Sequence, residues 1–237
     1  MEKFLALWLE GPLQAWGYDS RFDTRRTLDF PTRSGLTGLL LAASGDSGPQ
    51  EELLAKMASF PLTVYGCDDA APVLTDFHMV GNGYDSGSDW EKFMILKTKD
   101  GKIPNAAGNK KGGQRVSYRD YLVDRCFAAI WQMPVSFAGK FAAALQAPVY
   151  DIFLGRKCCV PSELVFQGCF DDEAGALAHL CELAQAKGRT LCRRYREVPD
   201  AEADEETLLL PDVPVRFGLH KLFRERNVKN EALEPES

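Results

Sequence analysis

Apolar and polar residues alternate along the chain in a pattern that predicts strands and helices in turn. Residues 3–9 form an apolar run that predicts a buried first strand ending at Gly11-Pro12. The run SGLTGLLLAAS predicts a short helix with Thr32 or Ser34 as its N-cap, and EELLAKMASF has helical apolar spacing. The β-branched and aromatic segments PLTVYGC and PVLTDFHMV predict two further strands.

The second half of the chain continues this alternation. YRDYLVDRCFAAIW predicts a strand, SFAGKFAAALQ a compact helix, and PVYDIFLGRKCCVPS a strand followed by a glycine-containing turn. GALAHLCELAQAKG predicts an amphipathic helix closed by Gly188, and TLCRRYREV predicts one more strand. This order predicts an α+β fold with the split βαβ, ferredoxin-like arrangement over residues 1–188, followed by a small C-terminal subdomain and tail over 189–237.

A segment of different character, at about residues 81–116, interrupts the first domain. Its parts GNGYDSGSD and DGKIPNAAGNKKGGQ contain almost no core-forming residues, although FMILKTK could form one strand. Such a long apolar-poor stretch inside a compact domain is usually functional or mobile. The pattern therefore predicts a hairpin-like insertion that leaves the domain and returns to it.

The charge balance of the whole chain argues against nucleic acid as a partner. The 28 Lys and Arg residues face 34 Asp and Glu residues, and the net charge is −6. The charges are, however, unevenly distributed. Residues 91–125 hold nine bases and four acids, residues 187–196 hold five bases and no acid, and residues 197–206 hold six acids and no base.

Two of the basic strips have features that suit unpaired RNA. Arg21, Arg25, Arg26 and Arg33 precede the first predicted helix, whose N-terminus would add N–H donors and partial positive charge for phosphates. In the insertion, Lys110 and Lys111 are interleaved with glycines, and Tyr118 and Tyr121 follow, so that an aromatic ring can stack on a base. The competing interpretation is that each charge run is only a solvated face.

Motifs for chemistry are missing from the sequence. It contains neither G-x-x-x-x-G-K-[ST] nor G-x-S-x-G, and its three histidines are dispersed, so no metal or cofactor is expected. His179 is expected to be structural, whereas His78 is weighed as a base for metal-free RNA cleavage through the 2′-hydroxyl. The seven cysteines form no C-x-x-C pair and are expected to be reduced and mostly packed.

The sequence also predicts a cytoplasmic location. The first residues, MEKFLALWLEG, lack the features of a signal peptide, and no window reaches the 18 or so apolar residues that a membrane span needs.

Several motifs together resemble the CasD family, the Cas-five-type subunit of the type I-E CRISPR surveillance complex, Cascade. They are GPLQAWG, PTRSGLTGLL, RDYLVDRCF, IFLGRKCCVPS, RRYREVP and RNVKN, and they span most of the chain in the expected order. The resemblance implies a fold of the RNA-recognition-motif-like RAMP superfamily with a β-hairpin thumb, which falls on about 81–116. It also implies a subunit without catalysis or cofactor that holds the 5′ handle of the CRISPR RNA (crRNA) and caps the backbone filament.

The resemblance further implies a set of partners and contact residues. The partners would be the crRNA, the backbone subunit and the large subunit, with target DNA touched only indirectly and no membrane involved. Combining the basic strips with the resemblance gives the following expected RNA-binding residues: Arg21, Arg25, Arg26, Arg33, Ser34, Lys97, Lys99, Lys110, Lys111, Arg115, Tyr118, Arg119, Gly155, Arg156 and Lys157.

Two alternatives remain open from the sequence alone. A related branch of the family, in type I-C systems, cuts the precursor RNA, so a metal-free endoribonuclease is the runner-up. The third possibility is a protein-only interaction module whose basic patches bind acidic partners.

Overall fold

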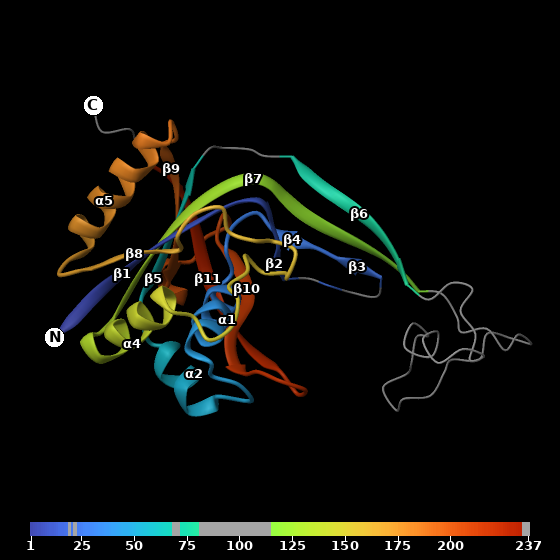
Figure 1. Cartoon of the computed structure of the whole chain (residues 1–237), viewed down its shortest axis with the longest axis horizontal. Helices are drawn as coiled ribbons and strands as arrows, with labels where there is room; N and C mark the ends of the chain where they lie inside the picture. Colours follow the sequence, from blue (N-terminus) through green and yellow to red (C-terminus); the bar gives the residue numbers. More distant parts are fainter. Residues whose placement is uncertain (19, 21–22, 68–71, 81–114, 234–237) are drawn as a thin grey trace, which may run out of the picture.

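A nine-stranded, mainly antiparallel sheet forms the centre of the molecule (Figure 1). The computed structural model describes residues 1–18, 20, 23–67, 72–80 and 115–233. The sheet strands are β1 (Glu2–Gln14), β3 (Thr24–Arg25), β5 (Leu62–Cys67), β6 (Val73–Val80), β7 (Arg115–Pro134), β8 (Phe166–Phe170), β9 (Leu191–Val198), β10 (Leu208–Arg216) and β11 (Leu222–Ala232). The short strands β2 (Trp16–Gly17) and β4 (Thr27–Leu28) pair separately.

The middle of the sheet has the strand order β8-β1-β7-β5, with every neighbouring pair antiparallel. β1 is longer than the sequence predicts, because it continues through Gly11-Pro12 and pairs with β7 as far as Gln14. The prediction that Gly11-Pro12 ends this strand is therefore wrong. Pairing with the 20-residue strand β7 outweighs the local turn signal.

Helices cover both faces of the sheet. On one face, α1 (Arg33–Ser44), α2 (Glu51–Met57) and α4 (Val135–Gln146) lie over a core that includes Leu7, Leu36 and Phe141. On the other face, α5 (Glu173–Ala186) packs against β1, β7 and β8 over a second core that includes Trp8 and Leu180. The alternation of β1 side chains explains both cores, since Leu5, Leu7 and Leu9 point one way and Ala6 and Trp8 the other.

The ends of two helices match their sequence signals. Thr32 is the N-cap of α1, and its side chain accepts a hydrogen bond from the Gly35 N–H at 3.2 Å. After α5 the chain turns at Gly188, the glycine that was expected to close this helix. Its φ of +68° is in the left-handed region that favours glycine.

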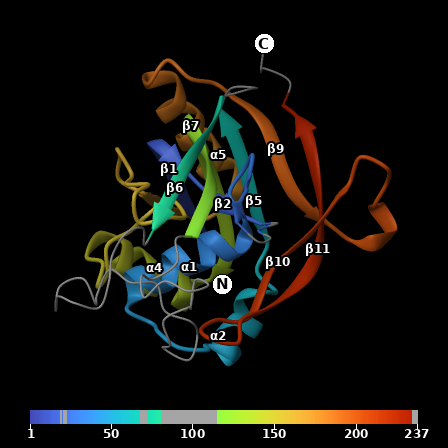
Figure 2. The same ribbon diagram turned by 90° about the vertical axis from the view of Figure 1, so that its right-hand side faces the viewer.

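The C-terminal segment from residue 189 extends the same sheet. β9 pairs with β5, β11 pairs with β9, and β10 forms the outer strand of a hairpin with β11 (Figure 2). A short 3₁₀ helix, η1 (Asp200–Glu202), lies in the connection between β9 and β10.

Two local expectations are wrong. Residues 148–161 contain no strand, and the strand that pairs with the edge of β1 is β8, at Phe166–Phe170. Cys67 and Cys126 are buried register partners on β5 and β7 and form a disulfide, whereas all seven cysteines were expected to be reduced. The free cysteines are Cys158, Cys159, Cys169, Cys181 and Cys192.

Candidate nucleic-acid interface

The hairpin of β6 and β7 extends from the body of the molecule, and β3 runs beside β7 along the protruding part (Figure 1). β3 pairs in parallel with β7, which places Thr24 opposite Tyr118 and Arg25 opposite Arg119. The Tyr118 N–H donates a hydrogen bond to the Asp23 carbonyl at 2.8 Å. Residues that are almost a hundred positions apart in the sequence thus meet at one place.

The hairpin presents different chemistry on its two sides. Phe77 and Tyr118 are register partners, and their rings meet edge to face with centroids 5.6 Å apart. Both are exposed, Phe77 by 57% and Tyr118 by 46%. Because successive side chains of a strand point to opposite faces, Arg119 and its partner Arg25 project from the other side. The predicted basic and aromatic strip is therefore divided between two sides of one hairpin.

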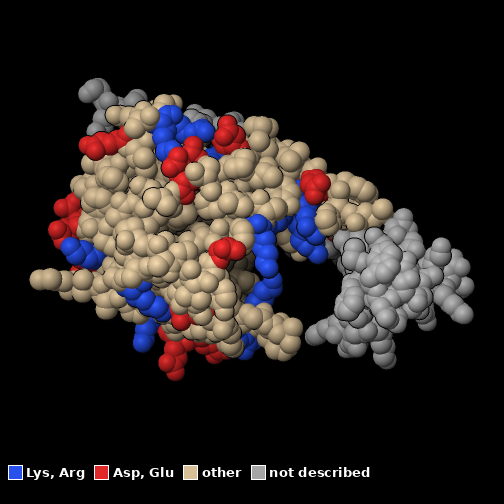
Figure 3. Space-filling view, viewed as in Figure 1, with Lys and Arg blue, Asp and Glu red and all other residues tan. Residues whose placement is uncertain are grey.

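Basic side chains also line the hollow between the hairpin and the body (Figure 3). Arg26, which follows β3, is exposed, and so is Lys157 in the turn after residue 154. Both remain candidates for contact with phosphates.

Arg156 connects the elements of this region. Its guanidinium donates hydrogen bonds to the Arg25 carbonyl at 2.9 Å and the Asp120 carbonyl at 3.0 Å, and it lies 4.6 Å from the centre of the Tyr121 ring. Arg156 therefore holds β3 against β7, because its guanidinium N–H groups donate to backbone carbonyls on both sides of the contact. We assign it a positioning role, and its expected contact with RNA stays a prediction.

Replacing Arg156 tests that role. We expect Arg156→Met and Arg156→Lys to lower the free energy of unfolding by similar amounts, about 1–3 kcal/mol, because neither side chain can donate the two forked hydrogen bonds. Chemical denaturation measures this change, with Lys157→Met as the exposed control. If Arg156→Lys kept full stability, charge alone would explain the residue and the positioning role would be wrong.

Gly155 also has a structural role. Its φ is +97°, and a Cβ at this position would lie 1.8 Å from the Ala15 carbonyl oxygen. Only glycine lets the turn approach the end of β1 so closely. Its expected contact with RNA stays a prediction beside this role in packing.

Arg33 and Ser34, the expected phosphate site at the first helix, have partners within the protein. Arg33 is 2% exposed, and its backbone N–H donates a hydrogen bond to the Asp212 carboxylate at 2.7 Å. Asp212, on β10, thus supplies the negative charge that a helix N-terminus favours. Ser34 is half-buried, and its hydroxyl donates to the Thr32 hydroxyl oxygen at 3.4 Å. The protein itself already provides an anion where a phosphate was expected.

The side chain of Arg33 belongs to a charge cluster with Asp212 and Arg226, which are buried, and Glu197, which is exposed. Arg226 donates two hydrogen bonds to Asp212, at 2.6 and 2.9 Å, and Arg33 lies 3.5 Å from the Glu197 carboxylate. The guanidinium of Arg33 also donates to the Phe60 carbonyl at 2.6 Å. Burial lowers the pKa of Arg33 to about 10, which leaves it positively charged at neutral pH. This cluster ties α1 to the β10–β11 hairpin.

Several predicted contact residues lie outside the described residues. These are Arg21, Lys97, Lys99, Lys110 and Lys111, together with the expected thumb over most of 81–116. Arg115 is the first residue of β7, and its backbone pairs with Val80. The contacts of these residues with RNA stay predictions.

The basic run at 187–196 is largely paired with acids. Lys187 lies 3.1 Å from Glu10 and 2.6 Å from Glu163, and Arg189 lies 3.6 Å from Glu10. Although burial alone would raise the pKa of Glu10, hydrogen bonds from Trp8 and Lys187 hold that pKa below its usual range. This part of the run therefore fits the solvated-face interpretation.

A low pH is expected to weaken the ion pair between Lys229 and Asp204. The Lys229 ammonium lies 2.7 Å from the Asp204 carboxylate and lowers the pKa of Asp204 to about 2. A carboxyl with a depressed pKa stabilises the fold above its unfolded pKa of about 3.9 and loses that contribution as the pH falls to about 2. NMR titration should show this low pKa, and Lys229→Met should raise it, although the hydrogen bonds from Thr207 and the Glu206 N–H still hold the pKa below its usual range. An unchanged Asp204 pKa in the variant would contradict the pairing.

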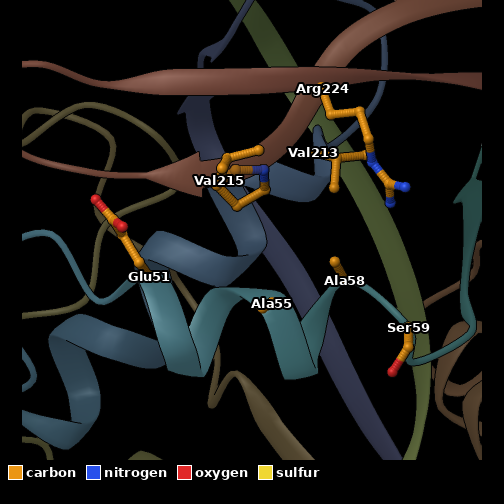
Figure 4. A pocket seen from close by; sticks show the side chains of 8 residues that line it. Glu51, Ala55, Ala58, Ser59, Val213, Val215 and Arg224 are labelled. Atoms are coloured by element: carbon orange, nitrogen blue, oxygen red, sulfur yellow. The ribbon is translucent and has the colours of Figure 1, made fainter.

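The described part of the chain contains no obvious catalytic constellation. A cavity of about 590 Å³ between α2 and β10–β11 is lined mainly by Ala, Val and Pro, with Glu51, Ser59 and Arg224 as its polar residues (Figure 4). His78 lies 3.9 Å from Asp76, and both are on β6. His179, in α5, packs on the ring of Phe170, on β8. Among the described residues, no group of three or more His, Cys, Asp or Glu side chains is placed to hold a metal ion.

Sequence reasoning missed Phe77 and the pair of Asp212 and Arg226. Phe77 lies in a predicted strand, but only its register with Tyr118 shows that the two rings form an exposed pair. The local signal that could have suggested this pair was the apolar character of PVLTDFHMV next to the insertion. No local signal pairs Asp212 with α1.

Comparisons with known proteins identify the family. The family model described as CRISPR-associated protein (Cas_Cas5) matches residues 4–229. The chain belongs to this family. It is also 30% identical over 171 residues to the protein described as CRISPR system Cascade subunit CasD of Escherichia coli strain K12, and the match covers 71% of each chain. The resemblance to CasD drawn from the sequence motifs is thereby confirmed.

Solved structures of Cas proteins share the fold of this Cas5 family member. A chain of a CRISPR RNA-guided surveillance complex superposes with a TM-score of 0.72 and 26% identity, covering 97% of this chain and 89% of that one. A second structure, described as a Cas protein, has a TM-score of 0.60 at 24% identity, covering 97% and 94%, and shows the shared fold alone. The α+β class with an antiparallel sheet is confirmed. Among the described residues, no helix has the length and apolar character that crossing a membrane requires.

Proposed function

We propose that this Cas5 family member is a crRNA-binding subunit of a type I-E Cascade complex in antiviral defence. It holds the 5′ handle of the crRNA at the end of the backbone filament, next to the large subunit, without cutting RNA. Its kinship with the Cascade subunit CasD and its likeness to a chain of an RNA-guided surveillance complex support this proposal.

The single observation that carries the RNA contact is the chemistry of the β6–β7 hairpin. Exposed rings of Phe77 and Tyr118 offer stacking surfaces for unpaired bases, and Arg119 and Arg25 offer charge for phosphates from the opposite side. RNA that passes around the hairpin would meet both sides. In this proposal Arg26, Lys157, Arg115 and the lysines of the insertion add further phosphate contacts.

The strand order supports a finer description of the fold. The order β8-β1-β7-β5, with α1 and α4 on the connections, corresponds to a ferredoxin-like fold of the RAMP superfamily. We include in this proposal a thumb at about 81–116 that continues the β6–β7 hairpin, and a small C-terminal unit over 189–237 formed by β9–β11.

Tyr118→Ala should weaken RNA binding. Loss of one stacked base costs about 1–3 kcal/mol, so the dissociation constant of the assembled complex for its RNA should rise about 5- to 100-fold. Tyr150→Ala is the matched control, since Tyr150 is 55% exposed and lies at the far end of α1. Equal effects of the two variants would contradict a contact at the hairpin.

Two experiments test the function as a whole. The chain is co-expressed with the other Cascade subunits and a CRISPR array, and the RNA in the purified complex is sequenced. Uniform RNAs with a common 5′ end are expected, whereas random RNA or none would contradict the proposal. Incubation of the isolated chain with precursor RNA in EDTA should give no product, and a discrete product would show an endoribonuclease.

A further inference from the structure

A second group of basic side chains lies on the sheet surface beyond α5. Arg194 and Arg196 on β9 point to the same side as Tyr65 on β5, and Lys229 on β11 is the register partner of Arg196. We call Arg194, Arg196 and Lys229 the β9–β11 basic face. α5 packs against β1, β7 and β8, and the side chains of Arg194 and Arg196 are 41% and 35% exposed.

Carboxylates from two sources neutralise the β9–β11 basic face. Glu231, on β11 itself, lies 2.7 Å from Arg194 and 3.0 Å from Arg196. The others come from the connection between β9 and β10, where Glu202 lies 3.5 Å from Arg196 and Asp204 lies 2.7 Å from Lys229. One acidic segment, residues 200–206, therefore covers part of this face.

The attachment of residues 200–206 to the sheet is polar. All seven residues are exposed, and their backbone hydrogen bonds are short-range, such as Ala203 N–H to Asp200 O. Besides the two ion pairs, the Asn227 amide donates to the Asp200 carboxylate at 2.7 Å. Figure 2 shows the segment at the outer edge of the sheet, beside β9 and β11. A segment without buried apolar contacts opens easily.

We propose that the β9–β11 basic face is a latent binding site for single-stranded RNA and that residues 200–206 form an acidic strap that masks it. With the strap in place, its carboxylates form ion pairs with Arg196 and Lys229 and repel phosphates. With the strap displaced, Glu231 stays paired with Arg194 and Arg196, but the three cations of the face outnumber this carboxylate and give the two neighbouring strands a net positive charge. Contacts of this kind recognise the phosphate backbone without regard to sequence.

The strap also accounts for the opposite charges of neighbouring segments. Residues 187–196 hold five bases, and the next ten residues hold six acids. An ordinary solvated face does not need the acids to fold back on the bases, yet Glu202 and Asp204 do so. The strap thus restricts RNA to other surfaces of the protein, a role that stands whether or not the crRNA handle binds at the β6–β7 hairpin.

The test compares two variants of the full chain with the same change in net charge. Glu202→Gln with Asp204→Asn removes the strap carboxylates that contact the face, and Asn keeps the Oδ1 acceptor for Thr207. Glu205→Gln with Glu206→Gln is the control, because no side-chain base partner of these two glutamates is found among the described residues. The probe is a labelled oligouridylate, with binding measured over a range of salt concentrations.

The strap variant should bind oligouridylate roughly three- to tenfold more tightly than the control variant. Its dependence of log K on log salt should steepen by about 0.7 for each cation that becomes available. Adding Lys229→Gln to the strap variant should remove most of the gain. Unfolding midpoints and circular dichroism spectra, compared across the variants, show that each one is folded.

Three outcomes would overturn the proposal. Equal gains in the strap and control variants would show an effect of net charge alone. A gain that survives Lys229→Gln would place the RNA on another surface. Tighter binding of polyglutamate without tighter binding of oligouridylate would show a site for acidic protein.

Discussion

Asp212→Ala is expected to lower the free energy of unfolding by about 3–5 kcal/mol, because it leaves the buried guanidinium of Arg226 without the carboxylate that accepts its two hydrogen bonds. Asp212 is 3% exposed and accepts two hydrogen bonds from Arg226. It also accepts a hydrogen bond from the backbone N–H of Arg33 at the start of α1. Urea denaturation followed by circular dichroism measures the change.

Asp171→Ala is the matched control for Asp212→Ala. The Asp171 side chain is 88% exposed and pairs with Lys3 at the surface, so its loss should cost less than about 1 kcal/mol. Similar losses for both variants would contradict the assignment of the Arg33 cluster as a structural link between α1 and the β10–β11 hairpin.

Gly155→Ala should have the second large effect, about 2–5 kcal/mol, which combines an unfavourable positive φ with a steric clash. A Cβ at Gly155 would lie 1.8 Å from the Ala15 carbonyl oxygen, so the turn must move. Because the neighbouring Arg156 holds β3 against β7, the movement should also weaken RNA binding at the hairpin.

Gly188→Ala separates the two causes. Gly188 has a φ of +68° but no atom within 4 Å of a Cβ, so this variant pays the conformational cost alone, about 1–2 kcal/mol. Thermal unfolding compares the two variants. If Gly155→Ala were no more destabilising than Gly188→Ala, the close approach to Ala15 would not constrain the turn.

Local signals predicted the elements that depend on local interactions. Thr32 caps α1, and Gly188 follows α5, because caps act within a few residues of a helix end. The α+β class with an antiparallel sheet also followed from periodicity. The end of β1 was missed because its continuation depends on register with β7, which no local pattern of the sequence reveals.

The functional residues were harder to predict, since their roles depend on distant partners. Arg33 has the sequence context of a phosphate-binding residue, but Asp212, 179 positions later, takes the place of the phosphate. Arg156 was expected to contact RNA, but the carbonyls of Arg25 and Asp120 receive its hydrogen bonds. Tyr118 was predicted to stack on RNA and has an exposed ring, whereas its partner Phe77 could be found only from the hairpin register.

The most direct test of the RNA contact is crosslinking in the assembled complex. Ultraviolet crosslinking of the purified complex, followed by mass spectrometry, identifies the peptides that carry nucleotides. The expected result is crosslinks on β6 and β7 at Phe77 and Tyr118, which disappear in a Phe77→Ala, Tyr118→Ala double variant. Crosslinks confined to β9–β11, or none on the hairpin, would contradict the proposed interface.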